Sequence, residues 1–116
     1  MILKMTKFKS VKSTNDSAIE LIQKFNHTSG LVVSDEQTKG KGTMGKKWIS
    51  KKGNIFISIF YKVNFTNLKI ENFLLINANI IKKILKGYTK KKISIKKPND
   101  LLIENKKICG ILQEVI

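Results

Sequence analysis

The residues best suited to chemistry form one glycine-rich, basic stretch, Gly40-Lys41-Gly42-Thr43-Met44-Gly45-Lys46-Lys47. Glycine lets the backbone approach a ligand closely, successive N–H groups can then bind an anion, and lysine adds positive charge. The spacing matches G-x-G-x-x-G and most of a Walker A pattern. However, Lys47 stands where Walker A needs Ser or Thr, and no helix opens behind the stretch, as both motifs require. An anion-binding loop of another kind and a flexible surface hairpin are the interpretations that remain.

Three further polar segments accompany this loop. Ser13-Thr14-Asn15-Asp16 precedes a helical pattern and is rich in capping residues. Gln37 lies in the polar run directly before the loop, and Pro98-Asn99-Asp100 is a typical turn sequence. Lys107 lies in a hairpin, where spacing alone favours a solvated lysine. Cys109 follows in an apolar strand, which favours a small buried thiol over a nucleophile.

The elements that must position these segments follow from the hydrophobic pattern. A helix should run from the capping residues to Phe25 and a longer one over 70–86, with Gly87 as its C-cap. The predicted strands are 6–12, 31–33, 55–61, 93–95, 101–104 and 107–115, with Asn105-Lys106 as the last turn. This order predicts an α+β domain with a mixed or antiparallel sheet. An apolar strand reaching the last residue indicates a truncated domain or a paired edge.

Composition limits the classes of function. The 116 residues predict one small domain with one core. The 23 basic residues are all Lys and oppose eight acidic ones, for a net charge of +15. That charge suggests nucleic-acid binding, but A/T-rich codons would also produce it. One Cys and one His exclude an internal disulfide and a Cys/His zinc cluster. With no long apolar run and no signal-peptide core, a cytoplasmic protein without a membrane anchor is expected.

Taken in order, the four segments closely resemble the catalytic domain of biotin protein ligases, in the biotin/lipoate ligase superfamily, from about Lys7 to Ile116. The resemblance implies a class II synthetase-like α+β fold, with helices packed on one side of a mixed or antiparallel sheet. It also implies that residues 1–116 are part of that domain, truncated at the C-terminus, with no N-terminal helix-turn-helix and no C-terminal barrel domain.

The resemblance further implies a two-step reaction. Biotin and ATP, with Mg²⁺ as a co-substrate, would form biotinyl-5′-adenylate, and a lysine of a biotin carboxyl carrier protein would then accept the biotin. No residue is assigned to the metal. A specific nucleic-acid partner is not expected, and a homodimer stays open.

Individual roles follow from the same resemblance. Lys107 is the implied catalytic residue, because it matches the lysine that contacts the biotin carboxylate and the phosphate. The loop would fold over the adenylate and shield its mixed anhydride from water. The implied substrate-binding residues are Ser13, Thr14, Asn15 and Gln37 for the ureido ring, Gly40, Lys41, Gly42, Thr43, Gly45 and Lys46 in the loop, Trp48 near the adenine, Asn99 and Asp100 in the nucleotide and magnesium region, and Lys107 at the carboxylate and the phosphate.

The chain also departs from the family pattern. Lys41 and Lys46 stand where Arg is typical, Thr43 replaces another basic residue, and Lys97 stands where Trp is frequent. Lysine lacks the planar fork of arginine, so bidentate phosphate contacts are lost. Three alternatives therefore stay open: a lipoate ligase-like enzyme, an inactive biotin-binding fragment, and a basic nucleic-acid-binding module.

Overall fold

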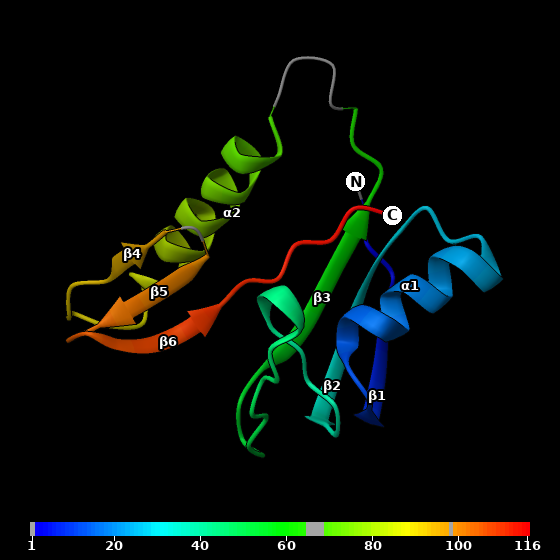
Figure 1. Ribbon diagram of the computed structural model, residues 1–116, viewed down its shortest axis with the longest axis horizontal. Coiled ribbons are helices and arrows are strands. Elements are labelled where there is room, and N and C mark those ends of the chain that lie inside the picture. Colours follow the sequence, from blue (N-terminus) through cyan, green and yellow to red (C-terminus); the bar gives the residue numbers. More distant parts are fainter. Residues whose placement is uncertain (1, 65–68, 98) are drawn as a thin grey trace. The chain divides into compact units, whose positions relative to one another are not determined.

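The computed structural model describes residues 2–64, 69–97 and 99–116. The described residues fold into the strands and helices labelled in Figure 1. In order these are β1 (Met5–Val11), α1 (Thr14–Phe25), β2 (Ser29–Gln37), a short 3₁₀ turn (Thr43–Gly45), β3 (Phe56–Tyr61), α2 (Ile70–Leu85), β4 (Ser94–Lys96), β5 (Asp100–Ile103) and β6 (Lys106–Gly110).

The elements form two compact units. The N-terminal unit comprises Met1–Val63 with Ile116, and the C-terminal unit comprises Asn64–Val115. Each unit buries its own hydrophobic cluster, so the prediction of a single core is wrong. The prediction failed because it rested on chain length, which limits the size of a core but not the number of cores.

The N-terminal unit is a mixed three-stranded sheet in the order β1-β2-β3, with α1 on one face (Figure 1). Strands β1 and β2 are parallel, while β2 and β3 are antiparallel. The amphipathic helix α1 places Ala18 against Val32 and Phe60, and Phe8, Leu21 and Ile22 complete the cluster. The sheet and helix therefore form the packed support on which the polar segments are mounted.

Parallel pairing brings two of those polar segments to one edge of the sheet. Val11 pairs with Gln37, so β1 and β2 end together, and Ser13 follows directly as the N-cap of α1. The predicted strand 31–33 is too short, because β2 runs from Ser29 to Gln37 and includes part of the polar run expected to end it. Ser34 is accommodated there by donating its hydroxyl hydrogen to the Glu36 carbonyl at 2.8 Å.

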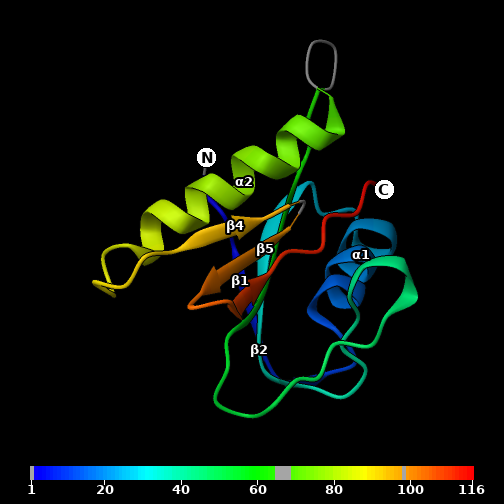
Figure 2. The ribbon, with the colours of Figure 1, turned by 60° about the vertical axis from the view of Figure 1, so that its left-hand side comes forward.

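The C-terminal unit is an antiparallel sheet in the order β4-β5-β6 with α2 packed against it (Figure 2). Ala78 of α2 is buried with Ile93 and Leu101. Ile103 pairs with Lys106, so the hairpin turn is Glu104-Asn105, one residue earlier than predicted. Both turn residues have positive φ, 52° and 63°, as a type I′ turn requires.

Two predicted ends in this unit are also wrong. Strand β6 stops at Gly110, and residues 111–116 follow as irregular chain. Helix α2 is capped by Lys86 in the right-handed region, and Gly87 donates its N–H to the Ile84 carbonyl. Pro98, central to the predicted turn before β5, lies outside the described residues. The α+β class, the mixed and antiparallel pairing and the packing of α1 on one sheet face are confirmed.

Candidate functional site

The first part of the site is the N-terminus of α1. Ser13 has an extended backbone, and its Oγ accepts a hydrogen bond from the Asp16 N–H at 3.0 Å. This satisfies one of the donors that the first turn of a helix leaves without a partner. Ser13 is only 1% exposed and Thr14 only 5%. The polar groups at this helix end are therefore held rigidly below the surface.

Ser58 on β3 joins this cluster, and sequence reasoning missed it. Its hydroxyl, 6% exposed, lies 2.7 Å from Thr14 Oγ1 and also hydrogen-bonds Asn15 Oδ1. The serine occupies an inward-facing position of β3 between the buried Phe56 and Phe60. A hydroxyl on the buried face of an otherwise apolar strand was the signal that could have identified it.

Gln37 connects the helix end to the segment after the glycine loop. Its Oε1 accepts from the Thr14 N–H at 2.8 Å, and its Nε2 donates to Ser50 Oγ at 3.1 Å. Ser50 in turn donates to the Trp48 carbonyl at 3.2 Å. Ser50 is the second residue that the sequence did not single out, since nothing in its spacing distinguishes it.

The glycine loop itself is a closed hairpin. The backbone N–H of Trp48 donates to the Gly40 carbonyl at 2.9 Å, and that of Gly42 donates to the Lys46 carbonyl at 2.7 Å. The backbones of Lys41 and Lys47 pair as an isolated antiparallel β-bridge. Only Gly45 among its glycines needs a positive φ, 73°, at the turn. Gly40 is required for space, because a Cβ there would lie 2.6 Å from the Trp48 carbonyl oxygen and clash with Ser50 Oγ. Thr43 and Lys46 lie on the exposed tip of the hairpin.

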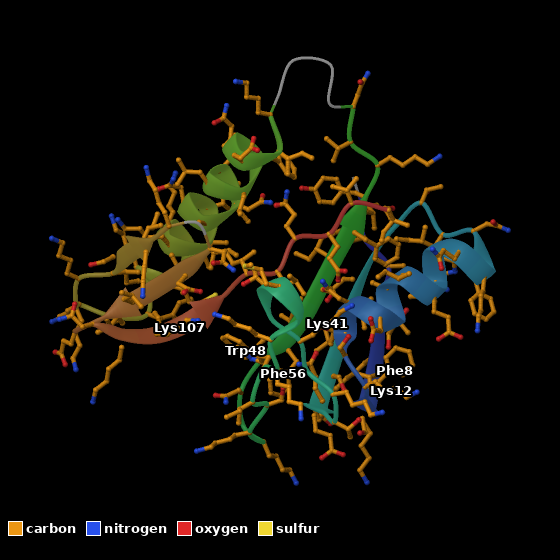
Figure 3. All side chains as sticks on the ribbon, in the orientation of Figure 1. Phe8, Lys12, Lys41, Trp48, Phe56 and Lys107 are labelled. Atoms are coloured by element: carbon orange, nitrogen blue, oxygen red, sulfur yellow. The ribbon has the colours of Figure 1, made fainter. Side chains whose placement is uncertain are left out.

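An ion pair ties this hairpin to α1. Lys41 Nζ lies 2.6 Å from Asp16 Oδ1. Figure 3 labels Lys41 between the loop and the helix. The hydrogen bond and charge of Lys41 keep the pKa of Asp16 below its ordinary value, with smaller contributions from Ser13 and Lys12. Asp16 is therefore ionised at neutral pH, and the loop is held by a charged contact.

The second group of predicted residues lies in the C-terminal unit. Lys107 Nζ forms an ion pair with Asp100 Oδ2 at 3.1 Å across the hairpin of β5 and β6. The ladder pairs Leu102 with Lys107 and Leu101 with Cys109, so Ile108 is an extra residue at a β-bulge. Bulges commonly redirect a neighbouring side chain, and this one lies next to Lys107. The carboxylate therefore holds the predicted catalytic ammonium group in place.

The remaining predicted residues of this unit make structural contacts. Asn99 donates from Nδ2 to the Ile111 carbonyl at 2.9 Å and accepts the Ile111 N–H on its own carbonyl at 3.0 Å. Burial, with a smaller contribution from Asp100, raises the pKa of Cys109, so its thiol stays protonated and is a poor nucleophile. Among the described residues, no His, Cys, Asp and Glu side chains gather into a metal-binding cluster.

The structure thus arranges the predicted residues in two sets. In the N-terminal unit, neutral donors and acceptors from Ser13, Thr14, Asn15 and Gln37 gather beside the glycine loop, which suits a polar, uncharged group of fixed shape. In the C-terminal unit, Lys107 supplies a positive charge that suits a carboxylate or phosphate. No helix in the described part of the chain has the length and apolarity needed to cross a membrane.

Comparisons with known proteins agree with this arrangement. The chain matches the model of the biotin/lipoate A/B protein ligase family over residues 7–116. Bifunctional ligase/repressor BirA of Bacillus spizizenii is 34% identical over 106 residues, which cover 90% of this chain and 33% of that protein. The chain therefore spans about one third of the length of this curated relative.

Solved structures give the same result. Biotin protein ligase from Aquifex aeolicus, in complex with biotin and ATP, has a TM-score of 0.82 at 28% identity, covering 98% of this chain and 47% of that one. The fold is also shared with biotin acetyl coenzyme A carboxylase synthetase from Helicobacter pylori with bound biotinylated ATP, at a TM-score of 0.88 and 24% identity, covering 99% of this chain and 56% of that one. Since the family model covers nearly all of the sequence, this chain belongs to the biotin/lipoate A/B protein ligase family.

Proposed function

We propose that this chain is part of the catalytic domain of an ATP-dependent biotin protein ligase that acts in the cytoplasm. The observation that carries the proposal is the buried polar cluster beside the glycine loop, in which Thr14, Gln37 and Ser58 are joined by hydrogen bonds. Biotin has a neutral ureido ring that offers one acceptor and two donors. A preorganised set of neutral partners recognises such a ring without having to desolvate a charge.

The first chemical step joins two anions. The biotin carboxylate attacks the α-phosphate of ATP, pyrophosphate leaves, and biotinyl-5′-adenylate forms. Lys107 neutralises the charge that builds up between carboxylate and phosphate, and Asp100, 3.1 Å away, orients its ammonium group. Magnesium enters with ATP as part of the substrate. The carboxylate of Asp100 and the side-chain oxygen of Asn99 are the kinds of donor that this ion prefers.

The second step transfers the acyl group. The lysine amine of a biotin carboxyl carrier protein attacks the carbonyl carbon of the adenylate, and AMP leaves. Until then the mixed anhydride must be kept from water, which is the role we assign to the hairpin of residues 40–48. Trp48 would pack near the adenine, while Lys41 and Lys46 would meet the phosphate as point charges.

A lipoate ligase-like enzyme is the second candidate, since the family includes lipoate ligases. The polar cluster favours biotin, because lipoate carries a disulfide ring that offers no strong hydrogen-bonding groups. The buried hydroxyl of Ser58 and the buried end of α1 would have little to contact in that ring.

The test separates all four candidates. The chain is titrated with biotin by calorimetry, and pyrophosphate release is then measured with ATP, Mg²⁺ and either biotin or lipoate. A biotin ligase binds biotin and releases pyrophosphate only when biotin is present. Release with lipoate alone indicates the lipoate enzyme, and binding without release indicates an inactive fragment. Absence of biotin binding, with salt-sensitive binding of DNA or RNA, would leave the nucleic-acid module.

A further inference from the structure

Four polar groups at the proposed biotin site are joined by three hydrogen bonds that run in one direction. At one end, the backbone N–H of Thr14 can only donate, and it donates to Gln37 Oε1 at 2.8 Å. At the other end, the Trp48 carbonyl can only accept, and it accepts from Ser50 Oγ at 3.2 Å. Between them, Gln37 Nε2 donates to Ser50 Oγ at 3.1 Å.

These three hydrogen bonds determine the orientation of the Gln37 carboxamide. Ser50 has a single hydroxyl hydrogen, and the Trp48 carbonyl takes it, so Ser50 can offer Gln37 only a lone pair. If the carboxamide were flipped, Nε2 would face the Thr14 N–H, and Ser50 could donate to Oε1 only by giving up its bond to the Trp48 carbonyl. Two of the three hydrogen bonds would be lost in either case.

We propose that Ser50 is a positioning residue that keeps Gln37 oriented as a hydrogen-bond donor to the ligand. The inference rests on the proposed biotin site. One Nε2 hydrogen of Gln37 is used by Ser50, and the second has no partner among the described residues. Oε1 already accepts one hydrogen bond, from Thr14, so the polar hydrogen of Gln37 left for a ligand is this second N–H. Its partner is an acceptor, such as the ureido oxygen of biotin.

The absence of a side chain at Gly40 leaves room for this arrangement. A Cβ on Gly40 would lie 2.6 Å from the Trp48 carbonyl oxygen and 3.0 Å from Gln37 Nε2, and it would clash with Ser50 Oγ. The Gly40 carbonyl also accepts the Trp48 N–H at 2.9 Å, which holds the Trp48 carbonyl close to Ser50. Gly40, the first glycine of the loop, thus leaves space for the hydrogen bonds that orient Gln37.

The test compares Ser50→Ala, Ser50→Thr and the matched control Ser34→Ala in the full chain. Ser34 is also a serine of the N-terminal unit whose hydroxyl donates to a backbone carbonyl, at 2.8 Å, but it does not contact Gln37. By calorimetry we expect Ser50→Ala to weaken biotin binding about tenfold, while Ser50→Thr and Ser34→Ala stay within about twofold of the parent. The KM for ATP should be unchanged in all three, because Gln37 is oriented toward the ureido ring alone.

A second measurement needs no ligand. In NMR spectra of the unliganded chain, Ser50→Ala should accelerate hydrogen exchange of the Thr14 amide about tenfold, and Ser50→Thr should restore its protection. The proposal is overturned if Ser50→Ala leaves both the biotin affinity and the exchange rate of the Thr14 amide unchanged. It is also overturned if Ser34→Ala weakens biotin binding and Thr14 protection as much as Ser50→Ala does. If the parent chain binds no biotin, the proposed function fails, while Thr14 exchange still decides whether Ser50 orients Gln37.

Discussion

The two units hold their functional side chains in opposite ways. In the N-terminal unit, Ser13, Thr14 and Ser58 are buried and joined to their neighbours by short hydrogen bonds between neutral groups. In the C-terminal unit, Lys107 has a side chain 43% exposed, and its ion pair is with Asp100, itself 16% exposed.

This difference matches two tasks. A rigid set of neutral dipoles discriminates by geometry, because a ligand lacking the complementary pattern leaves buried groups without partners. An exposed ammonium group gives little discrimination, but it adjusts to charge that develops during a reaction. The contrast predicts that variants of the polar cluster in the N-terminal unit change the binding of biotin. Variants of the β5–β6 hairpin in the C-terminal unit should instead change the rate of adenylate formation.

The strongest test of this contrast is Lys107→Ala. We expect pyrophosphate release in the presence of biotin and ATP to fall by a factor of about 100 or more, because a charge opposite the reacting anions is lost. Biotin affinity measured without ATP should change much less. Lys106→Ala, which removes the neighbouring lysine of β6, is the control and should retain activity. Pyrophosphate release at the parent rate by the Lys107 variant would remove that residue from the mechanism.

The second test is Ser58→Ala, which acts on the buried network. Removing the hydroxyl deletes its buried hydrogen bonds with Thr14 Oγ1 and Asn15 Oδ1, so the free energy of unfolding should fall by about 1–3 kcal/mol. Biotin binding should weaken in parallel, with the turnover of bound substrates little affected. Urea unfolding and calorimetry measure the two effects. Ser10→Ala, at an exposed position of β1, should change neither, and an unchanged Ser58 variant would contradict the assigned role.

The third test concerns the space beneath the loop. Gly40→Ala places a methyl group against Trp48 and Ser50, and the strain should destabilise the unit by about 1–3 kcal/mol. Gly42→Ala is the matched control, because its Cβ would lie 3.7 Å from the nearest atom. Trp48 is the only tryptophan, so its fluorescence reports directly on the loop. Equal spectra for both variants would show that the close approach at Gly40 is unimportant.

The smallest expected effect belongs to Asp16→Asn. The Asp16 side chain is 49% exposed, so loss of its pair with Lys41 should lower stability by only about 0.2–1 kcal/mol. Because the pKa of Asp16 is lowered on folding, the pair stabilises above the ordinary carboxyl pKa near 3.8 and is lost as the pH falls through the lowered value.

Urea unfolding from pH 7 to pH 2 measures this dependence. The difference between the parent chain and the Asn variant should vanish at the acid end. Glu20→Gln serves as the comparison, since it removes another exposed ion pair of α1, with Lys24, that does not touch the loop. A difference that persists at pH 2 would mean that the ion pair is not its source.

Local signals in the sequence predicted a large share of the fold and of the site. The start of the first helix was recognisable from the capping residues at 13–16, because capping depends on residues a few positions apart, and the structure identifies Ser13 as the N-cap. The two helices were readable from their apolar stripes. The order of the polar segments, rather than any single motif, indicated the family.

Contacts between distant residues were not predictable in the same way. Ser58 meets Thr14 across 44 positions, and such pairing depends on strand register that no local pattern encodes. Ser50 lies only 13 positions from Gln37, but the clash that keeps residue 40 a glycine appears only in three dimensions. The end of β6 was misplaced because the apolar run after Gly110 imitates a strand.

The parallel pairing of β1 and β2 has a consequence for how the protein is made. Every residue of the polar cluster lies between Ser13 and Ser58, within a strand–helix–strand unit and the strand that follows it. Parallel and long-range strand pairing fold more slowly than local structure, but chains fold from the N-terminus as they leave the ribosome. The polar cluster can therefore assemble while the ribosome has yet to add Lys107, so the groups proposed for recognition are in place in the nascent chain before the charge proposed for the reaction exists.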